Sequence, residues 1–241
     1  MIERKPPRRK TRDKTPISIY NELLINHINP LTPAQNLAFN EFDLNNKNLF
    51  LMGSPGTGKS FISLYLAIDG VYEKDFEKLI IIRSSEPSKK IGFLPGKVKE
   101  KMEEYERPYK DIFTEIFNKS NAYDLLKNRN IVEFMSTSFL RSLTFDNTII
   151  VVDECQNLQW NELYAVITRL GKNSRIIFSG DYAQSDLSYS NNVNVKGDIL
   201  KFIKVIENMN EFSIIKFGTA DIVRSGLVKS FIINCEKLGY V

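Results

Sequence analysis

The chain has 241 residues, of which 42% are hydrophobic and 26% are charged. This is ordinary globular composition, long enough for one sizeable core and short for two domains. No apolar stretch approaches the length that crosses a bilayer, and the N-terminus lacks the apolar core of a signal peptide, which argues against membrane-spanning and secreted classes. The two cysteines, Cys155 and Cys235, lack metal-ligand spacing, so we expect a reduced, cytoplasmic protein without a membrane partner.

A basic segment opens the chain. Residues 1–14 hold seven Lys or Arg against two acidic residues, a net charge of +5, whereas the whole chain carries +4. The segment has three prolines by position 16 and almost no apolar residues, so we expect a disordered basic tail over residues 1–16. Such a tail either contacts nucleic acid or aids solubility, and the sequence leaves both interpretations open.

Residues 29–39 predict a turn followed by a helix, because Thr32 suits the N-cap and Pro33 suits the first helical position. Gln35 lies on this helix, just upstream of the strongest motif in the chain.

That motif is Gly-x4-Gly-Lys-Ser at residues 53–60, satisfied at every required position. It stands between an apolar run at 48–52 and a helical stretch at 61–68, where a strand turns into a helix. Glycines let backbone amides surround an anion, Lys59 reaches the β- and γ-phosphates, and Ser60 ligates Mg2+. The motif therefore predicts a loop that binds the phosphates of a nucleotide through Gly53, Ser54, Pro55, Gly56, Thr57, Gly58, Lys59 and Ser60.

The next segments predict a buried strand at 78–83, ending in Arg83, and a loop at 91–96. Phe93 in that loop either stacks on a base or pins the loop to the core. Residues 97–119 predict two helices broken by Pro108, and residues 122–127 predict one short helix.

A strand at 131–135 and a capped helical turn at 137–142 follow. Arg141 comes after a strand end, where open parallel sheets bind ligands, and is a candidate contact for phosphate or nucleic acid. A structural ion pair is the alternative for Arg141.

The second strong signal is the β-branched run at 148–152, which leads directly into two acids. This pattern describes a buried strand that carries carboxylates to the carboxyl edge of the sheet. Asp153 fits the residue that holds Mg2+, and Glu154 fits the residue that polarises the attacking water.

A further strand at 175–179 ends in polar residues. Gln184 is a candidate sensor of the γ-phosphate, and Asp181 a candidate that orients it. The alternative is a turn in which an aspartate caps the backbone.

The C-terminal part predicts a helix at 198–206, a strand at 212–217 and a final amphipathic helix after 221–228. Arg224 stands in an otherwise apolar stretch. It suits either an arginine finger that stabilises transition-state charge or a buried salt bridge.

Five segments together resemble the PhoH-like ATPases, most closely their short, phage-encoded members. They are the phosphate-binding loop and residues 92–96, 153–156, 180–187 and 221–228, joined by Tyr-Glu-Arg-Pro-Tyr at 105–109. The resemblance extends from about residue 30 to residue 241. Gly-Phe-Leu-Pro-Gly and Asp-Ile-Val-Arg are specific to that family, whereas the phosphate-binding loop is shared by very many ATPases.

The resemblance implies an α/β fold: a RecA-like P-loop NTPase with a mostly parallel sheet flanked by helices, as one domain over residues 17–241. By analogy with superfamily one helicases, Gln35 is similar to the glutamine that reads adenine, and the alternative is a glutamine on the protein surface. By the same analogy, Arg224 is similar to the arginine finger. One motor-like domain needs a neighbouring subunit to supply the finger, so the resemblance implies a ring, a homohexamer. Ser84 follows Arg83 where relatives often have proline, which weakens the transfer of a nucleic-acid contact to Arg83.

We therefore expect a protein that binds ATP with Mg2+, hydrolyses it and acts on nucleic acid, RNA rather than DNA, as a helicase-like motor. The alternative is a nucleotide-dependent switch or assembly factor acting on protein partners. A P-loop kinase is disfavoured, because Glu154 beside Asp153 suits activation of water. We expect a bacterial or phage source and no nuclease activity.

Overall fold

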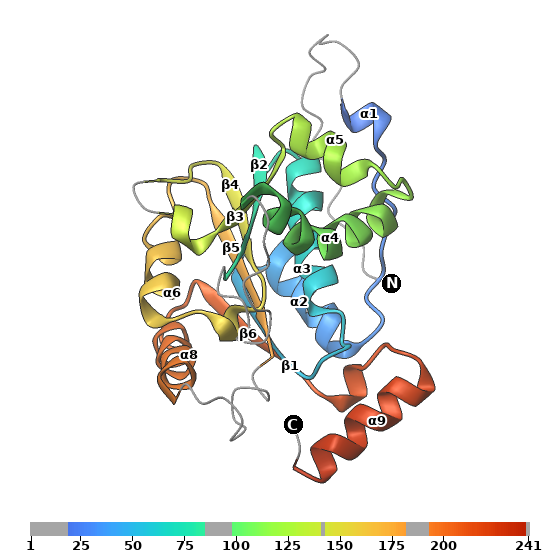
Figure 1. The fold of residues 1–241 in the computed structure, drawn as a ribbon, viewed down its shortest axis with the longest axis vertical. Coiled ribbons are helices and arrows are strands. Elements are labelled where there is room, and N and C mark those ends of the chain that lie inside the picture. Colours follow the sequence, from blue (N-terminus) through green and yellow to red (C-terminus); the bar gives the residue numbers. More distant parts are fainter. Residues whose placement is uncertain (1–18, 85–97, 141–142, 182–192, 240–241) are drawn as a thin grey trace.

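The computed structural model describes residues 19–84, 98–140, 143–181 and 193–239, and six parallel strands form its central sheet. The strand order is β3-β2-β4-β5-β1-β6, and all five pairings are parallel, as expected from the sequence. Figure 1 shows this twisted sheet between two groups of helices. The strands are β1 (Asn48–Gly53), β2 (Lys78–Arg83), β3 (Val132–Ser136), β4 (Thr148–Val152), β5 (Arg175–Gly180) and β6 (Phe212–Phe217).

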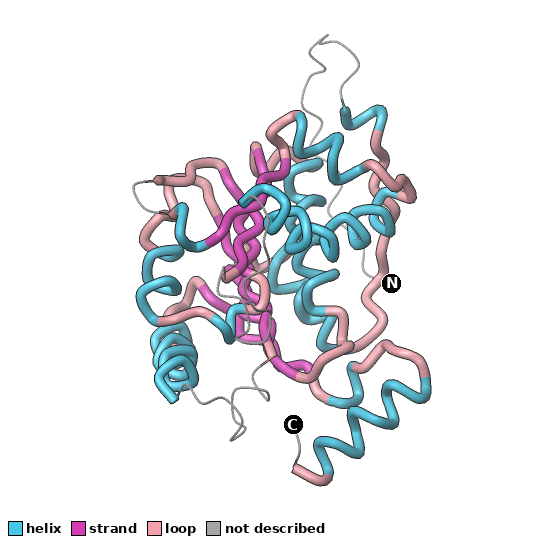
Figure 2. The backbone as a smooth tube through the Cα atoms, viewed as in Figure 1, coloured by secondary structure: helices cyan, strands magenta, loops and turns pink. Residues whose placement is uncertain are grey.

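Helices cover both faces of the sheet, which makes the fold a three-layer α/β sandwich (Figure 2). The helices α2 to α5 lie on one face with one hydrophobic cluster, and α6 and α8 lie on the other face with a second cluster. The helices are α1 (Ile19–Glu22), α2 (Pro33–Asp43), α3 (Lys59–Tyr72), α4 (Val98–Phe117), α5 (Ala122–Asn128), α6 (Trp160–Ile167), α8 (Val193–Ile206) and α9 (Gly226–Lys237), with short 3-10 turns η1 (Thr137–Phe139), η2 (Cys155–Asn157) and η3 (Thr219–Asp221).

Burial on both faces explains the apolar runs of the central strands. Every residue of β4 is buried, and four consecutive residues of β1 and of β2 are buried. The edge strands β3 and β6 keep several residues half-buried. The sheet is therefore a parallel sheet of the covered type, and polar side chains at its carboxyl edge are free to form a site.

The prediction of two helices broken at Pro108 is wrong, because α4 is one helix with Pro108 inside it. A proline in a helix removes one backbone hydrogen bond but does not stop the helix when packing holds both sides. Tyr109, Phe113 and Ile116 follow Pro108 and are all buried. Their burial outweighs the cost of the missing hydrogen bond.

Two helices differ from the sequence-based expectations, α6 in its presence and α9 in its burial. The helix α6 is not among the predicted elements, and it begins with a capping box between Gln159 and Glu162. The predicted helix α9 is present, but it buries none of its residues and exposes Leu227 and Phe231, as does the chain at Leu238 directly after it. Figure 1 shows α9 projecting from one end of the sheet.

The remaining expectations concern membrane-spanning helices, the N-terminal tail and three candidate site residues. No helix in the described part of the chain is long and apolar enough to cross a membrane. The tail at 1–16 and the candidates Phe93, Arg141 and Gln184 lie outside the described residues. The division into a tail and one domain over 17–241 stays a prediction.

Replacing Gly53 with alanine tests the packing at the end of β1. Gly53 has a φ of +135°, and a Cβ there would overlap the backbone carbonyl of Phe217 on β6. We expect the free energy of unfolding to fall by at least about 2 kcal/mol, measured by urea denaturation, because backbone strain and overlap both oppose the change.

The control for this variant is Gly197→Ala in α8, where a Cβ would meet nothing within 4 Å. Helix propensity predicts a gain of up to about 1 kcal/mol for that change. If the Gly53 variant unfolded at the same urea concentration as the parent protein, the close approach of β1 and β6 would be contradicted.

Candidate nucleotide-binding site

The loop between β1 and α3 adopts the backbone conformation that its glycines were predicted to allow. Gly53, Gly56 and Gly58 have φ values of +135°, +76° and +85°, which side-chain-bearing residues rarely adopt. Gly58 is the N-cap of α3. The loop therefore directs backbone amides and the positive end of a helix to one place, where an anion binds well.

The strand order brings Asp153 to this loop. Strand β5 lies between β1 and β4, so the carboxyl ends of all three strands meet at one edge. The Ser60 hydroxyl donates to Asp153 Oδ1 at 2.7 Å, and Ser179 at the end of β5 donates to the same oxygen at 2.7 Å. Tyr109 on α4 donates to Asp153 Oδ2 at 3.1 Å. Three hydroxyls from three elements therefore hold a carboxylate that is 6% exposed.

Lys59 lies along its own loop. Its Nζ donates to the carbonyls of Gly53 at 2.6 Å and Ser54 at 2.7 Å. Burial lowers the pKa of Lys59, and the nearby carboxylate of Asp181 partly opposes this shift. The ammonium is therefore close to where the phosphates of a nucleotide would lie, with carbonyl partners that it can exchange for phosphate oxygens.

Glu154 is held by a residue to which the sequence analysis assigned no role. Gln156 donates from Nε2 to Glu154 Oε2 at 2.6 Å and accepts the backbone N–H of Asp181 on Oε1 at 3.1 Å. Glu154 has a φ of +53°, a left-handed conformation that is costly outside glycine. The Gln156 amide thus connects the candidate catalytic carboxylate to the loop that follows β5.

A small residue at position 180 makes this connection possible. A Cβ on Gly180 would lie 2.6 Å from Gln156 Oε1 and 2.8 Å from Cys155 Sγ. Cys155 itself is buried, and burial raises the pKa of its thiol. The Cys155 side chain therefore packs in the core behind the site and does not act as a nucleophile.

Gln35 connects α2 to the phosphate-binding loop. Its Nε2 donates to the Thr57 carbonyl at 3.0 Å, and its Oε1 accepts the Leu31 N–H at 2.8 Å. The side chain is 3% exposed, so the surface-glutamine interpretation is wrong. Adenine recognition by Gln35 stays a prediction, and it requires the amide to exchange at least one of these partners.

Arg224 lies beside the phosphate-binding loop of its own chain. A Cβ on Gly56 would lie 2.8 Å from Arg224 Cγ, and the Val223 N–H donates to the Gly56 carbonyl at 3.1 Å. Asp221 holds the preceding turn by accepting the N–H groups of Gly218 and Ala34. Arg224 is exposed, so the alternative of a buried salt bridge is wrong. No neighbouring subunit is needed to bring this arginine to the loop.

Several of these residues line one cavity of about 830 Å3. We call Gly56, Lys59, Ser60, Asp153, Glu154 and Arg224 its phosphate end, and the lining also includes residues 27–29, Phe61, Ile112 and Glu115. This size and this mixture of charged and apolar side chains suit a nucleotide. The Ser60 hydroxyl and Asp153 carboxylate, 2.7 Å apart, are oxygen donors of the kind that Mg2+ prefers, so the residues present fit a Mg2+-nucleotide.

Comparison with known proteins agrees with this geometry. A family model described as PhoH-like protein matches residues 27–236. The chain belongs to the PhoH-like family.

Relatives in this family include the PhoH-like protein of Bacillus subtilis, which is 30% identical over 80% of this chain and 59% of its own length. Protein PhoH of Escherichia coli K12 is 29% identical over 91% of this chain and 58% of its own. The chain thus spans under two thirds of these PhoH-like relatives. The solved Sulfolobus solfataricus SWI2/SNF2 ATPase core in complex with dsDNA aligns with a TM-score of 0.47 and 14% identity, over 80% of this chain and 46% of that one.

Replacing Lys59 with methionine tests the phosphate end of the cavity. We expect affinity for a fluorescent ATP analogue to fall at least about tenfold, because hydrogen bonds to charged groups contribute about 1.5–3 kcal/mol. Methionine also removes the donor to the Gly53 and Ser54 carbonyls, so urea unfolding of the variant should accompany the binding measurement to show that the fold is kept.

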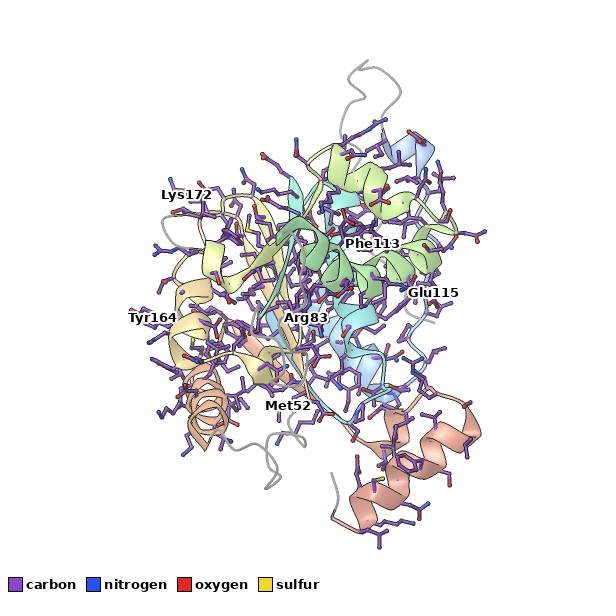
Figure 3. All side chains as sticks on the ribbon, viewed as in Figure 1. Met52, Arg83, Phe113, Glu115, Tyr164 and Lys172 are labelled. Carbon is purple, nitrogen blue, oxygen red and sulfur yellow. The ribbon has the colours of Figure 1, made fainter. Side chains whose placement is uncertain are left out.

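The matched control is Lys172→Met. Lys172 is exposed in the segment before β5, at the opposite end of the strands from Met52, which precedes the phosphate-binding loop (Figure 3). Its replacement should leave analogue binding unchanged. Equal binding by the Lys59 and Lys172 variants would contradict the assigned position of the phosphates.

Proposed function

We propose that this protein is an ATPase that binds ATP with Mg2+ in the cavity and hydrolyses it. The observation that carries the proposal is the hydrogen bond between Ser60 and Asp153, with Glu154 at the next position along the chain. A hydroxyl of the phosphate-binding loop and a strand-end carboxylate in contact form the metal-binding pair of P-loop enzymes.

The residues of the chain divide the work by their positions. The amides of the loop and the Lys59 ammonium bind the phosphates, with Lys59 leaving the carbonyls of Gly53 and Ser54 to do so. Ser60 and Asp153 would hold Mg2+, which would supply positive charge to neutralise the charge that develops on the phosphates. Glu154 accepts the proton of the attacking water, and Gln156 fixes the position of its carboxylate.

Arg224 and Gln184 complete this assignment. Arg224 lines the phosphate end of the cavity and stabilises negative charge on the transferred phosphoryl group. Gln184 follows β5 and senses the γ-phosphate, a role predicted from the sequence for a residue outside the described part of the structure.

Glu154→Gln separates binding from hydrolysis. We expect ATP affinity to change little, whereas kcat should fall at least about 100-fold, because an amide cannot accept the proton of the attacking water. Phosphate release gives kcat, and equilibrium binding of a fluorescent analogue gives affinity. Glu207→Gln, the same change at an exposed position after α8, should leave both quantities unchanged. Full turnover by the Glu154 variant would remove this residue from the mechanism.

The second part of the proposal is that the ATPase acts on nucleic acid, RNA rather than DNA. Support comes from the basic segment at residues 1–14 and from Arg83, which ends β2 at the same edge of the sheet as the phosphate-binding loop. Arg83, Phe93 and Arg141 are the proposed contacts. The preference for RNA and the helicase-like motor rest on the family resemblance alone.

A nucleotide-dependent switch that acts on protein partners is the alternative, and α9 favours it. Leu227 and Phe231 lie one turn apart on this helix and Leu238 follows its last residue, with 83%, 69% and 65% of their surface exposed. Such a surface suits a protein partner. The homohexameric ring expected from the sequence stays a prediction, and Arg224 lies beside the phosphate-binding loop of its own chain.

Addition of single-stranded RNA distinguishes the two functions. We expect RNA to raise the ATPase rate and to bind with an affinity that falls steeply with salt, because phosphate contacts release counterions. The rate and the binding constant should be measured at two salt concentrations, with DNA of the same sequence as comparison. An unchanged rate and no salt-sensitive binding would exclude action on nucleic acid and favour the switch.

A further inference from the structure

The Tyr109 hydroxyl lies between two charged groups inside the protein. Tyr109 is 1% exposed on α4, and its ring packs against Phe134 of β3 with centroids 5.6 Å apart. The hydroxyl donates to Asp153 Oδ2 at 3.1 Å. The side chain of Arg83 lies near the same hydroxyl. A guanidinium has donors and no acceptor, so it faces the phenolic oxygen while the phenolic proton points to Asp153.

The backbone fixes this arrangement from both sides. Strands β2 and β4 pair with Ile82 opposite Val152, and the Asp153 N–H donates to the Ile82 carbonyl at 2.9 Å. Arg83 and Asp153 therefore follow paired positions on neighbouring strands. Tyr109 reaches them from α4, a helix that continues through Pro108.

The hydrogen bond to Asp153 has a different role from that of Ser60. Ser60 exchanges its contact with Asp153 when the proposed metal binds, because its hydroxyl is itself a proposed ligand. Tyr109 and Ser179 are not proposed ligands, so their hydrogen bonds persist and orient the carboxylate. Groups that orient a metal ligand in this way strongly affect metal affinity.

Arg83 is the most solvent-accessible of the three residues Arg83, Tyr109 and Asp153. Its side chain is half-buried, whereas Tyr109 and Asp153 are buried. A phosphate that binds Arg83 neutralises its charge and draws the guanidinium away from the tyrosine oxygen. The hydroxyl is then less polarised by the nearby positive charge, which weakens its hydrogen bond to Asp153.

We propose that Tyr109 is a positioning residue that links Arg83 to the metal-binding carboxylate of Asp153, so that a nucleic-acid phosphate at Arg83 changes the rate of ATP hydrolysis. The positioning of Asp153 rests on the proposed ATPase, and the link to Arg83 rests on the proposed action on nucleic acid. The two parts are tested by separate measurements.

The positioning part is tested with Tyr109→Phe, which keeps the ring and removes the hydroxyl. The measured quantity is the Mg2+ concentration that gives half-maximal binding of a fluorescent, non-hydrolysable ATP analogue. We expect it to rise about tenfold, the usual effect of losing a group that orients a metal ligand. Binding of the analogue without Mg2+ should stay unchanged, because Tyr109 is not among the residues proposed to bind phosphate.

The control is Tyr123→Phe on α5, an equally buried tyrosine whose hydroxyl lies near Glu106 instead of Asp153. Urea unfolding of both variants shows whether the fold is kept. An unchanged or lower Mg2+ requirement for folded Tyr109→Phe would overturn the positioning role. An equal rise for Tyr123→Phe would overturn it as well, because the effect would then belong to any buried hydroxyl.

The link is tested by the stimulation of ATP hydrolysis by single-stranded RNA in Arg83→Gln, Tyr109→Phe and the double variant. We expect each single variant to lose most of the stimulation and the double variant to lose no more, because both interrupt the same path from Arg83 to Asp153. Stimulation that falls independently in the two variants would overturn the link. No stimulation of the parent protein would overturn the action on nucleic acid and the link together, while the Mg2+ requirement still decides the positioning role.

Discussion

The buried carboxylate of Asp153 is the interaction on which the site depends. It accepts hydrogen bonds from Ser60 on α3, Ser179 on β5 and Tyr109 on α4. A buried charge is costly unless hydrogen-bonded, so these partners are needed for the fold as much as for chemistry. Three elements separated in sequence thereby share one anchor. A substitution of Asp153 would remove a hydrogen-bond acceptor from α3, β5 and α4 at once.

The cavity is built at some expense to stability. Glu154 has a left-handed backbone conformation, and Lys59 keeps its charge in a place where burial lowers its pKa. Gly53 and Gly180 have no side chain, which lets the backbone of Phe217 approach Gly53 and the side chains of Gln156 and Cys155 approach Gly180. Functional sites concentrate such costs, and the two large apolar clusters on either face of the sheet offset them. The backbone conformation of Glu154 is therefore a cost that falls at the candidate site itself.

Sequence predicts those parts of the site that depend on local order along the chain. A glycine-rich turn between strand and helix, and acids directly after a buried strand, have fixed positions in any parallel sheet, so Ser60 and Asp153 could be paired in advance. The roles of Tyr109, Gln156 and Ser179 depend on which neighbour each side chain meets, and local patterns do not contain that information. Pro108 shows the same limit, because tertiary packing overrides its local preference.

The segment after β6 holds the phosphate-binding loop from a second side. The Val223 N–H bonds the Gly56 carbonyl, and the Ser54 hydroxyl bonds the Glu236 carboxylate on α9. The phosphate-binding loop is thus held between α3 on one side and the segment carrying Arg224 on the other. A shift of this loop on nucleotide binding must therefore reach α9, while a shift of Asp153 must reach Tyr109. The contact between the loop and α9 and the contact between Asp153 and Tyr109 involve different elements. A structural change at the exposed side of α9 therefore need not accompany a change at Arg83.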